Sequence, residues 1–238
     1  TELTPFMMYV LFDMPLALGT ITILCVDLGT DIMPSLSLAY EKPERGIMSR
    51  PPRDPVKDKM TNAKMVSFCY GQIGLIEASG GFFAYAVCLA QCGFWPSRAI
   101  GMRTFWDADV NDMRDSYGQE WTYEQRKKLE KACQSCFFIG IVVAQTANVL
   151  INKTKRVSLF RHGMRNMQMI AAILATLALA CFLVYTPKIN DALGLYPIKG
   201  LWWLPALPFA LYLMAYAELK KLMCNLFPGS WYDNELNW

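Results

Sequence analysis

Two acidic residues, Asp27 and Asp31, stand four positions apart inside an apolar run that is long enough to cross a bilayer. On an α-helix, residues i and i+4 lie on one face, so both carboxylates point to the same side. Each acid at the centre of a bilayer costs about 2.5–3.5 kcal/mol on insertion scales. The same run contains no Lys or Arg to pair with them. This spacing predicts a site that binds a cation.

The residues around the two acids favour an interrupted helix. Gly29 has a low helix propensity, and Pro34 has no N–H to donate to the Thr30 carbonyl. We expect local unwinding around residues 27–31, because backbone carbonyls freed at membrane depth are tolerated where they line a cavity. Hard oxygen ligands of this kind suit alkali cations.

The apolar residues fall in blocks, and the charged residues gather between them. Of the 238 residues, 54% are hydrophobic and 18% are charged. This composition is typical of an all-α, polytopic membrane bundle. We expect the end of a helix at 1–13 and full spans at 20–40, 65–90, 132–151, 166–185 and 201–223.

Charge and cysteine usage exclude other classes. The net charge is only +3 and no basic stripe with interleaved aromatics occurs, so we expect no nucleic-acid partner. Seven of the eight cysteines lie in or beside apolar runs, where a free thiol behaves as a small hydrophobe; these are Cys25, Cys69, Cys88, Cys133, Cys136, Cys181 and Cys224. Cys133-x-x-Cys136 lacks a second ligand pair nearby, so we expect packing there rather than redox or zinc chemistry.

The bias of basic residues predicts the orientation. The linkers 41–64 and 152–165 are rich in Lys and Arg, whereas acids offset the bases of the loop 91–131. By the positive-inside rule, both linkers and the C-terminus are cytoplasmic, and the loops 91–131 and 186–200 lie outside. The sequon that begins at Asn152 is then cytosolic and stays unmodified.

Several motifs resemble one family along the whole chain, in the same order and with similar spacing. They are Glu2-Leu3-Thr4-Pro5-Phe6, Asp27-Leu28-Gly29-Thr30-Asp31, Tyr70-Gly71-Gln72-Ile73-Gly74, the segment 116–126, Lys153-Thr154-Lys155-Arg156 and Trp202-Trp203. The chain resembles the catalytic α subunit of the Na,K- and H,K-ATPases, which are type IIC P-type ATPases. The resemblance implies the C-terminal membrane region, with the end of transmembrane helix five followed by helices six to ten.

The resemblance implies an ATP-driven transport enzyme and assigns its cation ligands. Glu2 on helix five would join Asp27, Thr30 and Asp31 on helix six, with Gln145 on helix eight. The transported ions would be K⁺ with Na⁺ or H⁺. ATP and Mg²⁺ would be bound by upstream domains, so we expect this chain alone to hydrolyse nothing. Asp27 is the residue typical of sodium pumps at its position.

Three positions depart from the family where sodium pumps form a third, sodium-only site. The helix-eight acid is replaced by Asn148, and the helix-nine acids are replaced by Ala175 and Thr176. An amide and a hydroxyl supply dipoles but no counter-charge for a dehydrated ion. We therefore expect the third site to be weakened or absent, and transport to be less electrogenic than three-for-two exchange.

Glu77 is a second departure, because the family usually has Gln at this position in the middle of helix seven. Two interpretations remain open. Either a protonated Glu77 takes the place of the amide, or it is an extra intramembrane ligand for a proton or cation.

The resemblance also implies partners and regulation. The extracellular segment with Ser116, Tyr117, Gly118, Gln119 and Trp121 would hold a single-span β subunit, beside the rest of the α subunit and the lipid bilayer. Ser158 follows a basic stretch and is a candidate phosphorylation site. Phe6 and Thr20 lie where cardiac glycosides bind in the family. The expected location is the plasma membrane.

Three functions fit these residues. The first is a Na⁺/K⁺-exchanging pump with a weakened third sodium site. The second is an H⁺/K⁺-exchanging pump of the same family, favoured by the lost third site and Glu77. The third is a non-catalytic relative that regulates other proteins. Upstream sequence with the phosphorylated Asp would separate the third from the first two.

Overall fold

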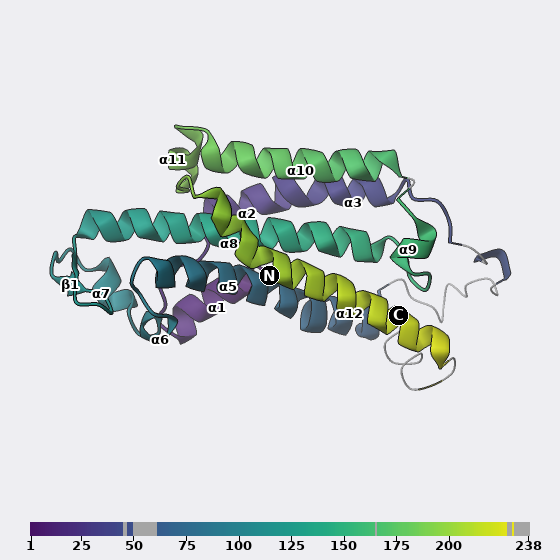
Figure 1. The fold of residues 1–238 in the computed structure, drawn as a ribbon, viewed down its shortest axis with the longest axis horizontal. Helices are drawn as coiled ribbons and strands as arrows, with labels where there is room; N and C mark the ends of the chain where they lie inside the picture. Colours follow the sequence, from purple (N-terminus) through teal and green to yellow (C-terminus); the bar gives the residue numbers. More distant parts are fainter. Residues whose placement is uncertain (45–46, 50–60, 165, 228–229, 231–238) are drawn as a thin grey trace.

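The computed structural model describes residues 1–44, 47–49, 61–164, 166–227 and 230 as a bundle of helices (Figure 1). Within these described residues, five helical segments are long and apolar enough to cross a membrane: Thr20–Leu38, Ala63–Gln91, Tyr123–Asn152, Met167–Tyr185 and Gly200–Leu226. The prediction of an all-α, polytopic membrane protein is confirmed.

The first span follows a short helix, α1 (Leu3–Leu11), and is built from three pieces. These are α2 (Thr20–Leu24), the π-helix η1 (Cys25–Asp31) and α3 (Ile32–Leu38). The predicted interruption therefore lies at the acids, but it has a different form. The backbone keeps winding as a π-helix there, and no unwound stretch occurs. A π-helix also changes the i→i−4 pairing, and such segments are frequent at functional sites.

The second span packs closely against the third. It consists of α4 (Ala63–Phe68), the π-helix η3 (Cys69–Ile73) and α5 (Gly74–Gln91). A Cβ added at Gly140 would lie 2.9 Å from the Gly81 Cα, so the two backbones nearly touch there. Gly80 packs on Phe209. The glycines of this span thus serve contacts inside the bundle.

The connection to the third span is an ordered loop with two short helices and a two-stranded hairpin. These are α6 (Pro96–Ala99), α7 (Arg103–Asp107), β1 (Met113–Arg114) and the antiparallel β2 (Glu120–Trp121). The third span, α8, runs over Tyr123–Asn152 and so begins well before residue 132, where the apolar run predicts its start. Thr122 and Gln125 form a capping box at its N-terminus, which fixes the earlier start.

Buried Arg126 holds the loop on the first turn of α8. Its guanidinium donates to the carbonyls of Trp106 at 3.2 Å and Ala108 at 2.9 Å, and also to those of Phe105 and Val110. This planar group with five donors can satisfy several carbonyls at once.

The remaining elements are η2 (Ile47–Ser49), α9 (Leu159–His162), α10 (Met167–Tyr185), α11 (Ile189–Leu193), the 3₁₀ helix η4 (Gly200–Ala206) and α12 (Leu207–Leu226). Helix α8 is the central helix, and Phe137, Phe138 and Ile139 on it are fully buried. Helix α10 lies beside α3 at the edge of the bundle and exposes apolar residues such as Leu174 and Phe182 (Figure 1). An apolar outer face of this kind suits contact with lipid.

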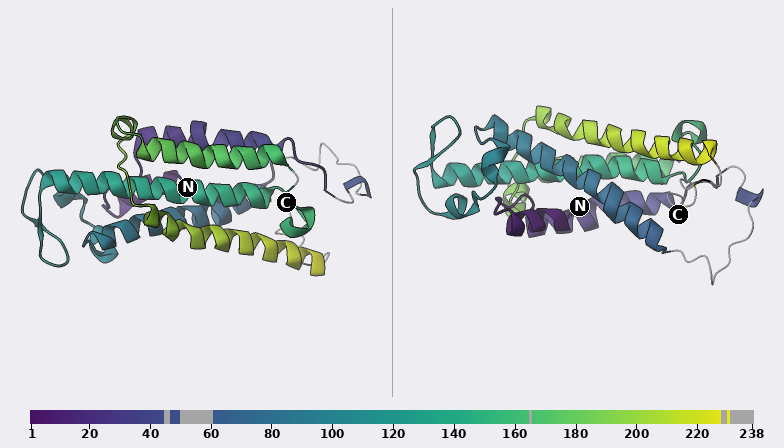
Figure 2. Two further views of the ribbon diagram at one scale, coloured as in Figure 1. Left: turned by 45° about the horizontal axis from the view of Figure 1, so that its top comes forward. Right: turned by 90° about the horizontal axis from the view of Figure 1, so that it is seen from below.

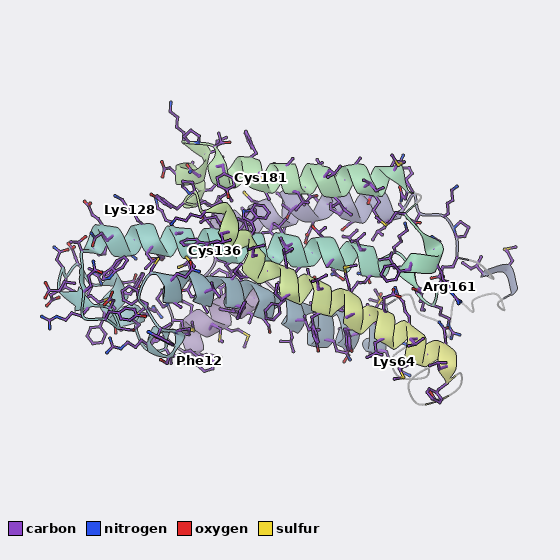
Figure 3. All side chains as sticks on the ribbon, in the orientation of Figure 1. Phe12, Lys64, Lys128, Cys136, Arg161 and Cys181 are labelled. Carbon is purple, nitrogen blue, oxygen red and sulfur yellow. The ribbon has the colours of Figure 1, made fainter. Side chains whose placement is uncertain are left out.

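The connections separate to opposite ends of the bundle in the views of Figure 2. The hairpin, α6, α7 and α11 lie at one end, and α9 with η2 lies at the other (Figure 1). Figure 3 places Lys128 towards the first end, and Lys64 and Arg161 towards the second. The two groups of connections that the charge bias assigns to opposite sides therefore do lie apart. Parts of the first basic linker (45–46 and 50–60) and the C-terminus, predicted to be cytoplasmic, lie outside the described residues.

Candidate cation site

The carboxyl groups of Glu2 and Asp27 lie within hydrogen-bonding reach of each other, and Asp31 is near enough to interact electrostatically with both. The chain's N-terminal end lies midway along the bundle (Figure 1), and Glu2 directly follows Thr1 there. Glu2 and Asp31 are partly buried, whereas Asp27 is exposed on this chain. Acids from two helices are therefore brought together, with one side of the group open.

Asp31 also faces α8, because the Gln145 side chain donates from Nε2 to its Oδ2 at 3.0 Å. Gln145 Oε1 is buried and has no hydrogen-bond partner among the described residues. Glu2 pairs with Asp27 while Asp31 turns to Gln145. Accordingly, no three His, Cys, Asp or Glu side chains of the described residues converge as a ready metal site. A cation held here would also need carbonyl, amide or water oxygens, which suits a weakly held alkali ion.

Thr30 is engaged elsewhere. Its side chain is buried and donates to the Val26 carbonyl at 2.9 Å. Since Pro34 has no N–H, the Thr30 carbonyl lacks its α-helical donor, and Thr176 Oγ1 on α10 lies 3.5 Å from it. The freed carbonyl expected from the sequence thus faces α10, on a different side from the acids.

The three positions that the resemblance assigns to a third sodium site, Asn148, Ala175 and Thr176, carry no acid. Thr176 is buried, and its hydroxyl donates to the Ala172 carbonyl at 3.0 Å. Ala175 is exposed. Asn148 lies on the α8 face that also carries Gln145, and it lines the same small cavity as Glu77. Glu77 is 5% exposed and accepts a hydrogen bond from Thr1 Oγ1 at 3.1 Å. A buried acid on α5 thus lies against the α8 position that lacks one.

Of the two residues associated with glycosides, Phe6 is partly buried on α1 and Thr20 is exposed at the start of α2.

Two cysteines that are far apart in the sequence lie side by side in the fold. The sulfur atoms of Cys88 and Cys133 are 3.4 Å apart. Figure 3 shows Cys136 on α8 and Cys181 on α10. All eight thiols are free.

The segment implied in β-subunit contact is a tight turn, and Asp115 holds it. The Asp115 Oδ1 accepts from the backbone N–H of Tyr117 at 2.9 Å and of Gln119 at 2.8 Å. Its Oδ2 accepts from the Trp121 indole at 3.3 Å. Burial would raise the pKa of Asp115, but these donors outweigh it and lower the pKa. The sequence analysis missed Asp115, although an Asp before an exposed turn is a common Asx signal.

The five segment residues differ in exposure. Tyr117, Gly118 and Gln119 are exposed, with Tyr117 at 74%, and Gly118 has a φ of +86°, which favours glycine. Ser116 and Trp121 are partly buried. Ser116 Oγ accepts from the Trp95 N–H at 3.2 Å, and Trp121 packs edge-on against Phe94. Ser116 and Trp121 therefore hold the turn in place, and Tyr117, Gly118 and Gln119 form its exposed surface.

Ser158 lies at the other end of the bundle and donates to Glu218 Oε2 on α12 at 2.6 Å.

A separate cluster forms around the Glu41 carboxylate. Its Oε1 lies 3.0 Å from His162 Nε2 and 3.4 Å from Lys153 Nζ, and its Oε2 accepts from Asn166 Nδ2 at 3.0 Å. Burial would raise the pKa of Glu41, but the bonds from Asn166 and His162 and the Lys153 charge lower it. His162 is thus part of an ion cluster that joins the loop ends.

The comparison with known proteins agrees with this arrangement of helices. Residues 15–223 match the family described as "Cation transporting ATPase, C-terminus". The chain is 50% identical over 235 residues to the sodium/potassium-transporting ATPase subunit alpha-B of Artemia franciscana, covering 98% of this chain and 23% of that protein. It is 51% identical to the alpha-2 subunit of Gallus gallus and 50% identical to the alpha subunit of Drosophila melanogaster, with the same coverage of 98% and 23%.

The chain thus spans about a quarter of the length of these relatives, at 23%. Its matched residues include all five apolar spans except for the end of the last. Both the helical architecture and the sequence match lead to one conclusion: the chain belongs to the cation-transporting ATPase family and corresponds to its C-terminal membrane region.

Proposed function

We propose that this chain is the ion-binding membrane region of an ATP-driven pump that exchanges Na⁺ and K⁺. The observation that carries the proposal is the grouping of Glu2, Asp27 and Asp31 from two helices, with Gln145 bonded to Asp31. Intramembrane acids are costly unless they bind something. Relatives with half of their residues identical over this region are sodium/potassium-transporting ATPase subunits.

The remainder of the pump would supply the other parts of the reaction. In this proposal, ATP and Mg²⁺ bind to domains outside this chain, and this chain alone hydrolyses no ATP. Asp27 is exposed here, which fits a site completed by helices from the rest of the α subunit. The protein would lie in the plasma membrane, with its C-terminus in the cytoplasm.

The third sodium site would be weakened. The hydroxyl of buried Thr176 is bonded to the carbonyl of Ala172 in its own helix, and Asn148 offers only an amide. Neither provides a counter-charge for a dehydrated ion. We expect each transport cycle to move less net charge than three-for-two exchange does.

The exposed turn at Tyr117, Gly118 and Gln119 would hold a β subunit. Its shape is fixed by Asp115 and by the Ser116 and Trp121 contacts, so it is formed before a partner arrives. An exposed tyrosine on a rigid turn is a frequent anchor in protein interfaces.

The function is tested on the full-length protein by phosphoenzyme formation from ATP. We expect Na⁺ to stimulate formation and K⁺ to speed its breakdown. Formation that depends on H⁺ and not on Na⁺ would support the proton pump instead. No phosphoenzyme under any ionic condition would support the non-catalytic regulator and contradict the pump.

The third site is tested by measuring pump current and Rb⁺ uptake in the same cells. We expect less current per Rb⁺ ion than a three-for-two sodium pump gives in parallel. An equal ratio in the two pumps would contradict the weakened site.

A further inference from the structure

Two buried thiols face each other where α5 packs on α8. Cys88 is 1% exposed and Cys133 is 0% exposed, and their sulfur atoms lie 3.4 Å apart. Cys133 donates its S–H to the Cys88 sulfur, so the two side chains are in direct contact. The sequence predicts only packing around Cys133, because Cys88 is 45 positions away along the chain.

The close approach of the two helices holds this pair in place. A Cβ on Gly140 would lie 2.9 Å from the Gly81 Cα. Cys88 follows Gly81 by seven residues, and Cys133 precedes Gly140 by seven residues. Seven residues are about two helical turns, so the thiols lie on the same contact stripe as the glycines. A disulfide requires Cα atoms about 4.4–6.8 Å apart, and small residues are what let two helices approach so closely.

Helix geometry disfavours the other pairings of neighbouring thiols. Cys92 lies four residues after Cys88, and Cys136 lies three residues after Cys133. Cβ atoms at these spacings on one helix are about 5–6 Å apart, beyond the ~3.5–4.5 Å of a disulfide. Between Cys88 and Cys133, the sulfur atoms need only close from 3.4 Å to about 2.0 Å, which is less than about 1 Å of movement for each.

A cavity of about 430 Å³ gives small molecules a route towards the pair. Its wall includes Cys92, one turn past Cys88, and Ala132, which directly precedes Cys133. Trp121 of the hairpin also lines it, so the cavity lies at the loop end of the bundle. A water molecule takes about 30 Å³ of liquid, so a neutral oxidant of similar size fits easily.

We propose that Cys88 and Cys133 are a site of reversible oxidation by peroxides, and that the disulfide they form locks α5 to α8. Hydrogen peroxide oxidises one thiol to a sulfenic acid and releases one water. The second thiol attacks that sulfur, forms the S–S bond and releases the oxygen as a second water. Two thiols and one peroxide thus give one disulfide and two waters, and an added dithiol reverses the bond by exchange. Because the thiolate is the reactive form and burial favours the thiol, the reaction is slower than at an exposed cysteine.

The test uses the full-length protein in membranes, first reduced with dithiothreitol and then freed of it. Hydrogen peroxide is added, the protein is denatured, remaining thiols are blocked with N-ethylmaleimide, and the digest is made without reduction. We expect mass spectrometry to find the peptides of Cys88 and Cys133 joined, and dithiothreitol to separate them. The variant Asp109→Cys, with a thiol in the exposed loop, sets a time and dose well beyond its own complete oxidation. N-ethylmaleimide on both Cys88 and Cys133 after that treatment overturns the site.

Matched variants assign the bond. Cys133→Ala removes one partner and should abolish the joined peptides. Cys136→Ala, one turn away on the same helix, should keep them. Joined peptides that persist in Cys133→Ala, or that are lost in Cys136→Ala, would contradict the assigned pair.

Thermal unfolding of the same samples tests the lock. A disulfide between residues 45 positions apart restricts the unfolded chain, so oxidised wild type should melt a few degrees above reduced wild type. Cys136→Ala should show the same shift, whereas Cys133→Ala should melt at one temperature in both states. Equal melting temperatures for joined and reduced wild type would show that the bond does not lock the helices.

Discussion

Single acidic residues in this protein fall into two groups. Asp115 and Glu41 are surrounded by donors, and each fixes a loop end in place. Asp27 and Glu77 lie in spans without a basic partner among the described residues, and Glu77 has an unpartnered oxygen. The first group stabilises the fold through its charge, and the second group has unmet charge, which is the property a cation site requires.

The role of Asp115 predicts a pH effect on the exposed turn. Because the folded pKa is lowered, the stabilisation from the ionised carboxylate is present at neutral pH and is lost as pH falls through that lowered pKa, below the ordinary value of about 3.9. In the variant Asp115→Asn, the amides of Tyr117 and Gln119 should exchange hydrogen several-fold faster than in the wild type at pH 7.

Comparing the two proteins at each pH removes the intrinsic pH dependence of exchange. Their rates should converge only at acidic pH, as the wild-type carboxylate takes up its proton. Glu120→Gln, which removes a solvent-exposed ion pair with Arg114, is the control and should exchange as the wild type does. Identical rates for Asp115→Asn at neutral pH would contradict the role of Asp115.

At the scale of helices, the sequence predicted what depends on local pattern. The apolar runs and the i,i+4 acids were sufficient to anticipate five spans and the interruption at Asp27 and Asp31. The π-helical form of the interruption was not predicted, because Gly29 and Pro34 indicate weak α-helix without specifying the alternative. The start of α8 at Tyr123 was missed because its first turns are charged, although the capping box at Thr122 signals it.

Contacts between helices could not be predicted from the sequence, because they depend on which faces of the helices pack together. Asn148 and Glu77 are 71 positions apart, and no local pattern joins them. The same holds for Arg126, whose carbonyl partners lie in a loop without regular periodicity. Asp27 and Asp31 could be recognised from the sequence because they are the only charged residues in a long apolar run, where charges are rare.

The close approach of α5 and α8 can be tested by enlarging one glycine. Gly140→Ala places a methyl group 2.9 Å from the Gly81 Cα, where only backbone could move. Overpacking of this kind costs about 1–3 kcal/mol and pushes the helices apart. Cys88 and Cys133, whose sulfurs lie 3.4 Å apart, report the separation through copper-phenanthroline cross-linking in membranes.

We expect Gly140→Ala to lower both the thermal stability and the rate of the Cys88–Cys133 cross-link. In Gly71→Ala, the added methyl meets Ser67 Oγ at an ordinary 3.9 Å, so cross-linking should match the wild type. A Gly140→Ala variant that cross-links at the wild-type rate would show that the helices are not packed through this glycine.

At the scale of the whole molecule, the loops at the two ends of the bundle carry different chemistry. One end has the hairpin of β1 and β2, and the other end has α9 (Figure 1). The turn of the hairpin carries the exposed Tyr117, and His162 of α9 forms a cluster with Glu41 and Lys153. From the charge bias we expect this cluster to lie on the cytoplasmic side. The expected orientation therefore predicts which end of the bundle can be glycosylated in a cell.

The sequon at Asn152 tests that orientation. We expect Asn152 to remain unmodified in cells, because it would lie on the cytoplasmic side, away from the glycosylation machinery. The double variant Asp112→Asn and Arg114→Thr creates a sequon in the exposed opposite loop and should gain one glycan. Gel shifts with and without glycosidase measure both, and modification at Asn152 would reverse the orientation.

The central claim is that acids of two neighbouring helices hold the transported ion, and occlusion of ⁸⁶Rb⁺ by the full-length protein tests it most directly. Asp31→Asn keeps the side-chain shape but removes a charge, so the apparent Rb⁺ affinity should fall by about tenfold or more. Asp109→Asn in the exposed loop is the matched control and should occlude Rb⁺ as the wild type does. Unchanged Rb⁺ occlusion in Asp31→Asn would contradict the account.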